Sequence, residues 1–248
     1  MRDYRLDQIE KLHEIVEIFR ESEMAADSVL EVGYQQVVVV ARGSHWRKDG
    51  MGRTNTIGSI PGSEAGHVIT ASDVLAGVML QSPVVVFDDE HHYLGGAIAE
   101  KLLNDGLAVT LMTPAPVVSA WSEETLDQDI IQSRLVELGV DIVTGYNLTA
   151  IETDRVEVGG VYDERARSVK YAAVVMVTSR IPKDGLYYGL KNRPAALAEA
   201  GISTIKRIGD ALGPGLIAAA VWSGHRYARE LDAPPPGDVP FKRELVVV

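Results

Sequence analysis

Four almost wholly apolar runs dominate the hydrophobic pattern of this chain of 248 residues. They cover residues 37–41, 83–87, 108–112 and 172–177, and all except 108–112, which includes Thr110, are rich in valine. Apolar runs of this length, without polar alternation, are typical of strands that are buried on both faces. Helices and a further strand are predicted between them over residues 95–104, 121–138 and 140–144. The pattern therefore predicts an α/β fold whose strands are parallel and joined by helical crossovers.

The remaining segments have weaker patterns. Residues 6–19 carry apolar positions at helical spacing, although the β-branched end at residues 16–19 could instead form a strand. Three short segments between residues 148 and 171 alternate polar and apolar positions, which predicts an antiparallel meander. Residues 44–66 are rich in Gly, Ser, Asn and Pro and are expected to be a loop. The tail from Asp232, with three consecutive prolines, is expected to be extended and mobile or to lie over a neighbour.

Residues 81–180 contain a complete β-α-β-α-β-meander-β pattern. We therefore expect them to form one domain, inserted between two segments, 1–80 and 181–248, that fold together as a second domain. Both domains are expected to be Rossmann-like and three-layered. The second one is the incomplete member, because its own strand pattern lacks an opening β-α-β unit.

Composition narrows the classes of function. The net charge of −11 argues against nucleic acid or an anionic membrane as a partner. The absence of cysteine excludes disulfides, thiolate chemistry, iron–sulfur ligation and cysteine zinc sites from this chain. No apolar run has the length of a membrane span, and the first residues do not form a signal peptide, so a cytoplasmic protein is expected. Neither a catalytic residue nor a metal ligand is predicted.

The segment from Ile205 to Glu230 holds the clearest candidate site. A short apolar strand ends at Gly209-Asp210, a Gly/Pro turn follows, and a long helix comes next. Two-domain flavoproteins close over the flavin in this way. The glycine lets the backbone approach, the carboxylate accepts a hydrogen bond from a ribitol hydroxyl, and the helix N-terminus offers N–H groups to a pyrophosphate. No Gly-x-Gly-x-x-Gly motif accompanies it, so only the closing half of such a site is present.

The loop after the 83–87 strand is where a nicotinamide nucleotide would bind. It reads Asp88-Asp-Glu-His-His-Tyr-Leu-Gly-Gly96, which places three carboxylates where a pyrophosphate would lie. Each like-charge contact at ~4 Å costs about 1 kcal/mol in water and more near a protein surface. A solvated acidic turn is expected in preference to a metal site, and either in preference to NAD(P)H. Met112-Thr113-Pro114 also stands where an acidic residue would hold the ribose.

Several motifs together resemble one family. They are Arg2-Asp-Tyr-Arg5, residues 24–32, residues 37–47, Ile60-Pro-Gly62, Ala99-Glu-Lys-Leu102, Val177-Thr-Ser-Arg180, Ile208-Gly-Asp210 and residues 224–231. The whole chain resembles the C-terminal part of the family of trimethylamine, dimethylamine and histamine dehydrogenases and dienoyl-CoA reductase. The resemblance implies two dinucleotide-binding-like domains that follow a flavin-bearing barrel and an iron–sulfur cluster. The acidic loop at Asp88 resembles the amine dehydrogenase branch, in which the NADPH-like domain is degenerate.

The same resemblance implies the cofactor-binding residues. They are Arg42, Gly43, Gly209 and Asp210. Where the family has Ala-Thr-Gly, this chain has Ala41-Arg42-Gly43, and the arginine could clash with an adenine nucleotide or pair with a phosphate. No tight binding of FAD or ADP by the isolated chain is expected. Either could bind if a partner, a larger flavin and iron–sulfur subunit or a second copy of the chain, completes the site.

Three functions follow from these observations. The chain could be a C-terminal half or subunit of an amine dehydrogenase-like flavin oxidoreductase, supporting assembly or electron transfer rather than the chemistry. It could instead be a non-catalytic interaction module or remnant without a bound nucleotide. A free-standing NADPH-dependent reductase component is the third possibility, and the acidic loop argues against it.

Overall fold

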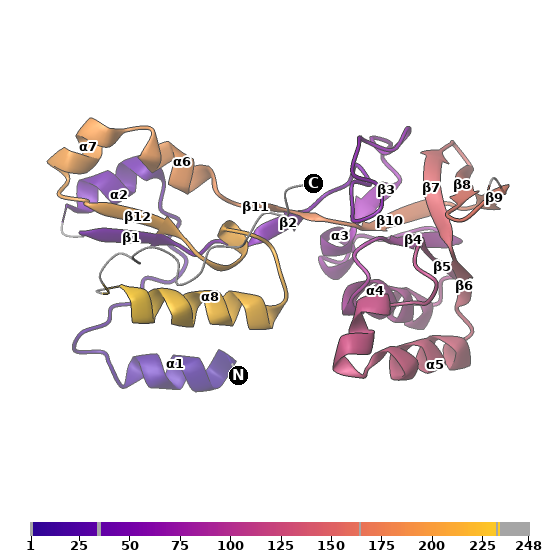
Figure 1. The fold of residues 1–248 in the computed structure, drawn as a ribbon, viewed down its shortest axis with the longest axis horizontal. Coiled ribbons are helices and arrows are strands. Elements are labelled where there is room, and N and C mark those ends of the chain that lie inside the picture. The colour runs from indigo at the N-terminus through magenta and orange to yellow at the C-terminus, as the bar shows by residue number, and fades with distance from the viewer. Residues whose placement is uncertain (1, 34–35, 164, 232, 234–248) are drawn as a thin grey trace, which may run out of the picture. The chain divides into compact units, whose positions relative to one another are not determined.

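A computed structural model describes residues 2–33, 36–163, 165–231 and 233. The chain forms two compact units, each assembled from two segments (Figure 1). Unit 1 comprises residues 1–40 and 184–207, and unit 2 comprises residues 41–183 and 208–248. Apart from Ala233, the extended tail predicted from Asp232 onward lies outside the described residues.

Unit 2 is built on a five-stranded parallel sheet in the order β3-β10-β4-β5-β6. The strands are β3 (Val68–Thr70), β4 (Val84–Asp88), β5 (Val109–Thr113), β6 (Asp141–Thr144) and β10 (Ala173–Val177). Every residue of β4 and β10 is buried, as the continuous apolar runs predicted. These two central strands are buried because both faces of the sheet are covered.

Helices cover one face of this sheet and an antiparallel meander covers the other (Figure 1). The helical layer consists of α3 (Ala71–Leu75), α4 (Tyr93–Asn104), the 3₁₀-helix η1 (Ala120–Thr125) and α5 (Gln128–Leu138). The meander consists of β7 (Tyr146–Ile151), β8 (Arg155–Gly160) and β9 (Ala166–Lys170). Val86 and Leu111 pack with the helices, whereas Phe87 and Met176 pack with the meander. The expected Rossmann-like, three-layer α/β architecture is confirmed in this unit.

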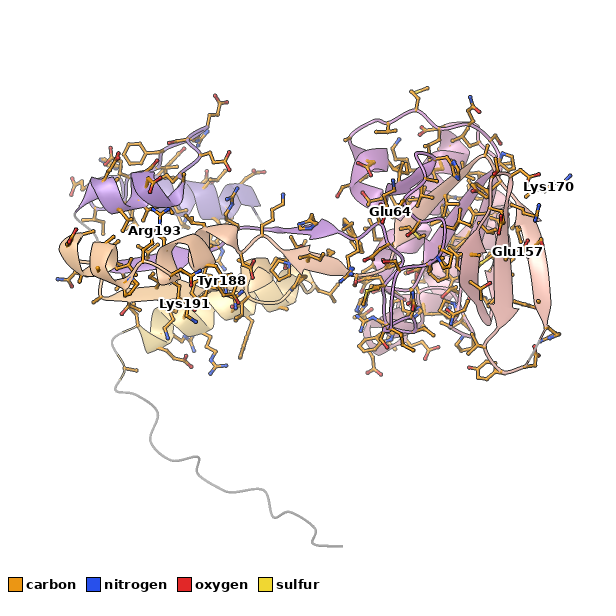
Figure 2. All side chains as sticks on the ribbon, turned by 90° about the horizontal axis from the view of Figure 1, so that it is seen from above. Glu64, Glu157, Lys170, Tyr188, Lys191 and Arg193 are labelled. Atoms are coloured by element: carbon orange, nitrogen blue, oxygen red, sulfur yellow. The ribbon has the colours of Figure 1, made fainter. Side chains whose placement is uncertain are left out.

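Unit 1 is smaller and contains a two-stranded parallel sheet, β1 (Val37–Val40) with β12 (Thr204–Arg207). Its helices are α1 (Arg2–Glu10), α2 (Ala26–Val32), α6 (Gly185–Lys191) and α7 (Pro194–Glu199). The core of unit 1 consists of Val29, Leu190 and Ile202 with partly buried neighbours. Tyr188, Lys191 and Arg193, which lie close to the core residue Leu190 in the sequence, are exposed (Figure 2).

The helix expected within residues 6–19 ends earlier than its apolar spacing suggests. It stops at Glu10, and residues 16–19 are neither helix nor strand. Ile15 and Phe19 are exposed, so the later apolar positions find no core to pack against. Helical spacing alone does not sustain a helix without such packing.

The boundaries of the units differ from the predicted division at residues 80/81 and 180/181. Residues 41–80 join unit 2, because β3 is the edge strand of its sheet and pairs with β10. With only three residues, β3 leaves little trace in the hydrophobic pattern. β1 and β4 lie in different sheets, and the described residues from Ile208 onward belong to unit 2 and not to the predicted domain of residues 1–80 and 181–248.

The loop expected over residues 44–66 begins with a short strand. This strand, β2 (Ser44–Trp46), pairs antiparallel with β11 (Arg180–Pro182) within unit 2. Unit 2 also contains the 3₁₀-helix η2 (Gly209–Ala211) and α8 (Ile217–Glu230). Among the described residues, none of the helices has both the length and the apolar character that a membrane crossing requires.

Candidate functional site

The predicted Gly209-Asp210 corner follows β12 after one intervening residue, Ile208. Gly209 has φ of +56°, a conformation that favours glycine, and its N–H donates to Ser223 Oγ at 3.0 Å. Asp210 lies in η2, and α8 follows after a turn. Leu216, the residue before α8, provides no side-chain cap, so the first N–H groups of that helix lack this partner in the described structure. The strand, turn and helix expected from the sequence are therefore in place.

The carboxylate of Asp210 is held by three donors within unit 2. Its Oδ2 accepts from Ser44 Oγ at 2.8 Å and from Arg180 Nη1 at 3.0 Å. Its Oδ1 accepts from the backbone N–H of Gly215 at 3.2 Å. A carboxylate offers about four acceptor positions, so one position on Oδ1 is left for a ligand hydroxyl.

Arg180, like Ser44, is a residue at this corner that sequence analysis did not assign. Besides Asp210, it donates to the carbonyl of Gly215 at 2.9 Å, and its guanidinium lies over the Trp46 ring. It therefore connects β11 to the turn that precedes α8. Arg180 and Ser44 both stand in the motifs that carry the family resemblance, which was the available signal for a role.

Of the other predicted residues, Gly43 lies beside β2 and Arg42 is exposed. The carbonyl of Gly43 accepts from the N–H of Lys183, and a Cβ at Gly43 would meet open space. No contact with the described protein thus requires glycine at position 43. Arg42, Gly43, Gly209 and Asp210 all belong to unit 2.

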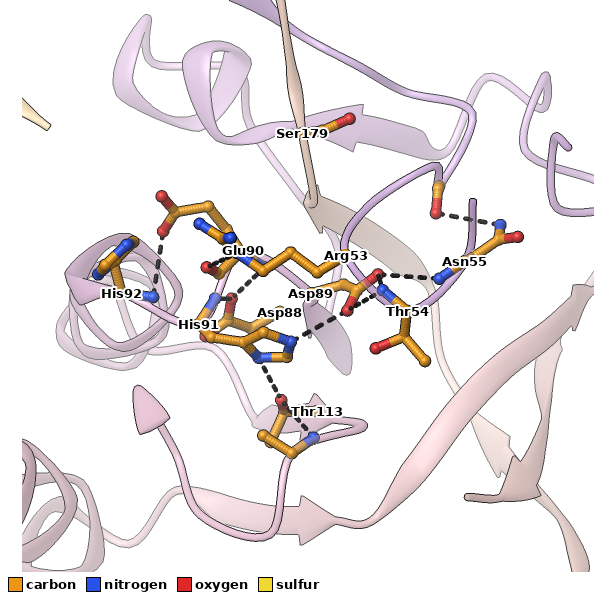
Figure 3. A network of polar contacts seen from close by, with 12 residues as sticks. Arg53, Thr54, Asn55, Asp88, Asp89, Glu90, His91, His92, Thr113 and Ser179 are labelled. Atoms are coloured by element: carbon orange, nitrogen blue, oxygen red, sulfur yellow. Dashed lines mark hydrogen bonds and ion pairs between the residues drawn. The ribbon is translucent and has the colours of Figure 1, made fainter. Parts of the chain in front are cut away.

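The acidic turn after β4 is buried, so the expectation of a solvated turn was wrong. Asp88 and Asp89 are fully buried and Glu90 is 8% exposed. The physical reason lies about 35 residues earlier in the sequence, where Thr54 N and Asn55 N donate to the Asp89 carboxylate (Figure 3). His91 Nε2 lies 3.1 Å from Asp89 Oδ1, and His91 Nδ1 lies 3.3 Å from Thr113 Oγ1. These partners replace the water that an exposed turn would need.

The pKa values of the neighbouring carboxyl groups of Asp88 and Asp89 are shifted in opposite directions. Burial raises the pKa of Asp88 to about 6, despite its hydrogen bonds from the N–H groups of His91 and Glu90. Burial acts in the same direction on Asp89, but the His91 hydrogen bond and the Thr54 and Asn55 donors outweigh it and lower the pKa of Asp89. Asp88 Oδ2 has no hydrogen-bond partner among the described residues, which agrees with a group that favours its proton.

The raised pKa of Asp88 predicts a pH-dependent stability. Since the folded pKa of about 6 exceeds the ordinary 3.8, the proton on Asp88 stabilises the fold below about pH 4, and this contribution is lost as the pH rises through 6. The Asp88→Asn variant should lack this pH-dependent contribution to its unfolding free energy. Relative to the original protein, it should gain up to roughly 3 kcal/mol of unfolding free energy between pH 4 and pH 7.

Urea unfolding at a series of pH values measures this difference. Asp154→Asn, at a side chain that is 71% exposed, is the control and should show no comparable trend. A difference between Asp88→Asn and the original protein that does not change with pH would contradict the prediction.

No metal site is found near this turn. Among the described residues, no three His, Asp or Glu side chains converge in a way that could hold an ion. The histidines and carboxylates of the turn instead contact backbone N–H groups and one another (Figure 3).

The sheet order and the Gly-Asp corner define a class: Rossmann-like units of the kind that flavin- and nicotinamide-dependent oxidoreductases contain. No family model matches the chain. It is 34% identical to dimethylamine dehydrogenase of Hyphomicrobium sp. (strain x), over 98% of the chain and 36% of that protein.

Two solved structures are similar to the chain as well. Histamine dehydrogenase from Rhizobium sp. 4-9 shares 40% identity with a TM-score of 0.82, over 92% of this chain and 34% of that one. The 6-hydroxypseudooxynicotine amine oxidase from Pseudomonas geniculata N1 shares 32% identity with a TM-score of 0.80, over 85% and 31% respectively. The chain is homologous to dimethylamine and histamine dehydrogenases, which confirms the resemblance inferred from its motifs. It spans about a third of the length of these relatives.

Proposed function

We propose that this chain is the nucleotide-binding-type part of an amine dehydrogenase-like flavin oxidoreductase. In that enzyme it supports assembly or electron transfer, and the amine is oxidised elsewhere. The observation that carries the proposal is the extent of the homology, which includes 98% of this chain but only 36% of dimethylamine dehydrogenase. The proposed partner is either a larger subunit or domain that carries the flavin and an iron–sulfur cluster, or a second copy of this chain.

A flavin or ADP is proposed to bind at the Asp210 corner once a partner completes the site. When bound, a flavin supplies the electron-accepting chemistry. Asp210 would accept a ligand hydroxyl on its remaining Oδ1 position, and the open space beside Gly43 would admit the ligand. The isolated chain offers a ligand few hydrogen-bond donors at this corner, because Arg180 and Ser44 already donate to the Asp210 carboxylate.

Unit 1 has features that support a partner. A groove of about 620 Å³ is lined mainly by apolar side chains of residues 19–39, including Phe19, Met24 and Val37. Within the described residues, β1 pairs with β12 on one edge only. An unpaired edge and an apolar surface are both features that proteins commonly cover in an assembly.

Two measurements test the proposal. Titration of the isolated chain with FAD and with ADP should give dissociation constants weaker than roughly 100 μM. Affinity purification of the tagged chain from its native cells should bring down a flavin- and iron–sulfur-bearing polypeptide. In that complex, Asp210→Asn should lower the retained nucleotide, whereas the exposed control Asp154→Asn should not.

The alternative is a non-catalytic interaction module with no nucleotide. The ion pair of Asp210 with Arg180 favours it, because the acceptor carboxylate already has a cationic partner within unit 2. A complex without flavin, in which Asp210→Asn changes nothing, would support this alternative and contradict the oxidoreductase role.

A further inference from the structure

Unit 2 has a topological switch point between β10 and β4. From β4 the chain proceeds to β5 and β6 on one side, whereas β10 and β3 lie on the other. Open parallel sheets bind ligands outside the carboxyl ends of their strands at such a point. Here those ends are Asp88 and Val177, and the N–H of Asp89 bonds the carbonyl of Val177 at 2.9 Å.

In the turn after β4, the backbone N–H groups that would face a phosphate already donate hydrogen bonds within the protein. Glu90 N and His91 N both donate to Asp88 Oδ1 at 3.0 Å. His92 N donates to Glu90 Oε2 at 3.1 Å. Three consecutive backbone donors before α4 therefore bind carboxylates of the turn itself, and these carboxylates hold the position of an anionic ligand.

A second segment, residues 51–55, covers this turn, and we call it the strap. On the β4 side, Thr54 N donates to Asp89 Oδ2 at 2.9 Å and Arg53 Nε donates to the carbonyl of Glu90 at 2.9 Å (Figure 3). On the β10 side, Ser179 Oγ donates to the carbonyl of Met51 at 2.6 Å. The strap is thus bonded to both sides of the switch point.

Close packing holds the strap against the turn. A Cβ at Gly52 would overlap the carboxylate of Asp89, so glycine permits the strap to lie this near. The Arg53 guanidinium lies 4.0 Å from the centre of the Trp121 ring, a favourable cation–π contact. Asp88 and Asp89 are fully buried and Glu90 is only 8% exposed, so the turn presents little carboxylate that could repel a ligand from a distance.

We propose that the strap and the carboxylates of the turn are a resident replacement for a dinucleotide, so that unit 2 excludes nicotinamide nucleotides by occupancy of its crevice. Charge repulsion at an open loop, the sequence-based explanation, is not needed. The proposal concerns unit 2 alone and does not depend on the function proposed for the whole chain.

Hydrogen exchange with residue resolution and calorimetry test this inference on the full chain. The amides of Thr54 and Asn55 should exchange at least ~100-fold more slowly than in an unstructured peptide. Neither NADH nor inorganic pyrophosphate should bind at concentrations up to about 1 mM. Asp89→Asn, which loses the charge that holds the strap, should accelerate exchange of these two amides by ~10-fold or more while the β4 amides stay protected.

The matched control is Asp154→Asn, which should leave strap exchange unchanged. If Asp89→Asn fails to fold, Ser179→Ala removes one bond on the other side and should accelerate exchange near Met51. Rapid exchange of Thr54 and Asn55 in the original protein would overturn the inference. Micromolar binding of NADH or pyrophosphate to that protein would overturn it too, as would strap exchange that neither variant alters.

Discussion

Replacing Gly62 by alanine is expected to lower the unfolding free energy of unit 2 by about 3–5 kcal/mol. Gly62 has φ of +84°, a conformation that alanine adopts only with strain. Its new Cβ would also overlap the carbonyl oxygen of Ile151 at the end of β7. That backbone cannot yield freely, because Ile151 N bonds the carbonyl of Pro61 at 2.8 Å and Ile151 is buried in the core.

Urea unfolding followed by tryptophan fluorescence measures this loss. Trp46, Trp121 and Trp222 all lie in unit 2, so the signal reports that unit. Gly66→Ala is the matched control: a Cβ there meets open space and the backbone is not left-handed, so the change should stay within about 0.5 kcal/mol. Equal effects of Gly62→Ala and Gly66→Ala would contradict the prediction.

Replacing Leu190 by alanine should unfold unit 1 while unit 2 stays folded. Leu190 is fully buried and packs with Val29 and Ile202, the other buried members of this core. Such a truncation typically costs about 3–5 kcal/mol. A core this small has little stability in reserve, so the loss should fall on unit 1 alone.

The two units can be followed separately. Unit 1 contains helices but no tryptophan, so far-UV circular dichroism should lose amplitude at a lower urea concentration than tryptophan fluorescence. The control is Leu12→Ala in the same unit, where the side chain is 47% exposed and the effect should be small. If both signals change together in Leu190→Ala, unit 1 and unit 2 unfold as one.

The central sheet of unit 2 was accessible from sequence because its signal is local. β4 and β10 are continuous apolar runs, and burial of every residue in both strands follows directly from that pattern. β3 was missed because it has three residues and depends on pairing with β10, more than a hundred residues later. Local pattern identifies strands that are long and buried, whereas a short edge strand exists only through its partner.

The site shows the same limit. The strand, turn and helix around Gly209 and Asp210 are sequential, and they formed as expected. The environment of Asp89 was misjudged because its burial depends on Thr54 and Asn55, which nothing in the acidic loop itself indicates. The partner of Asp210, Arg180, is likewise distant in sequence. A carboxylate-rich loop is therefore solvated or buried according to what folds over it.

The division of unit 1 into two segments also sets an order of events during synthesis. β1 pairs only with β12 among the described strands, and Val37 lies opposite Thr204. At about 5–20 residues per second, the ribosome takes roughly 10–30 s to make the intervening chain. The sheet of unit 2 is complete once β10 has emerged, before β12 is made. The four consecutive valines of β1 thus lack their β12 partner while the intervening residues are synthesised, an interval in which a chaperone or slow elongation would determine the yield of folded chains.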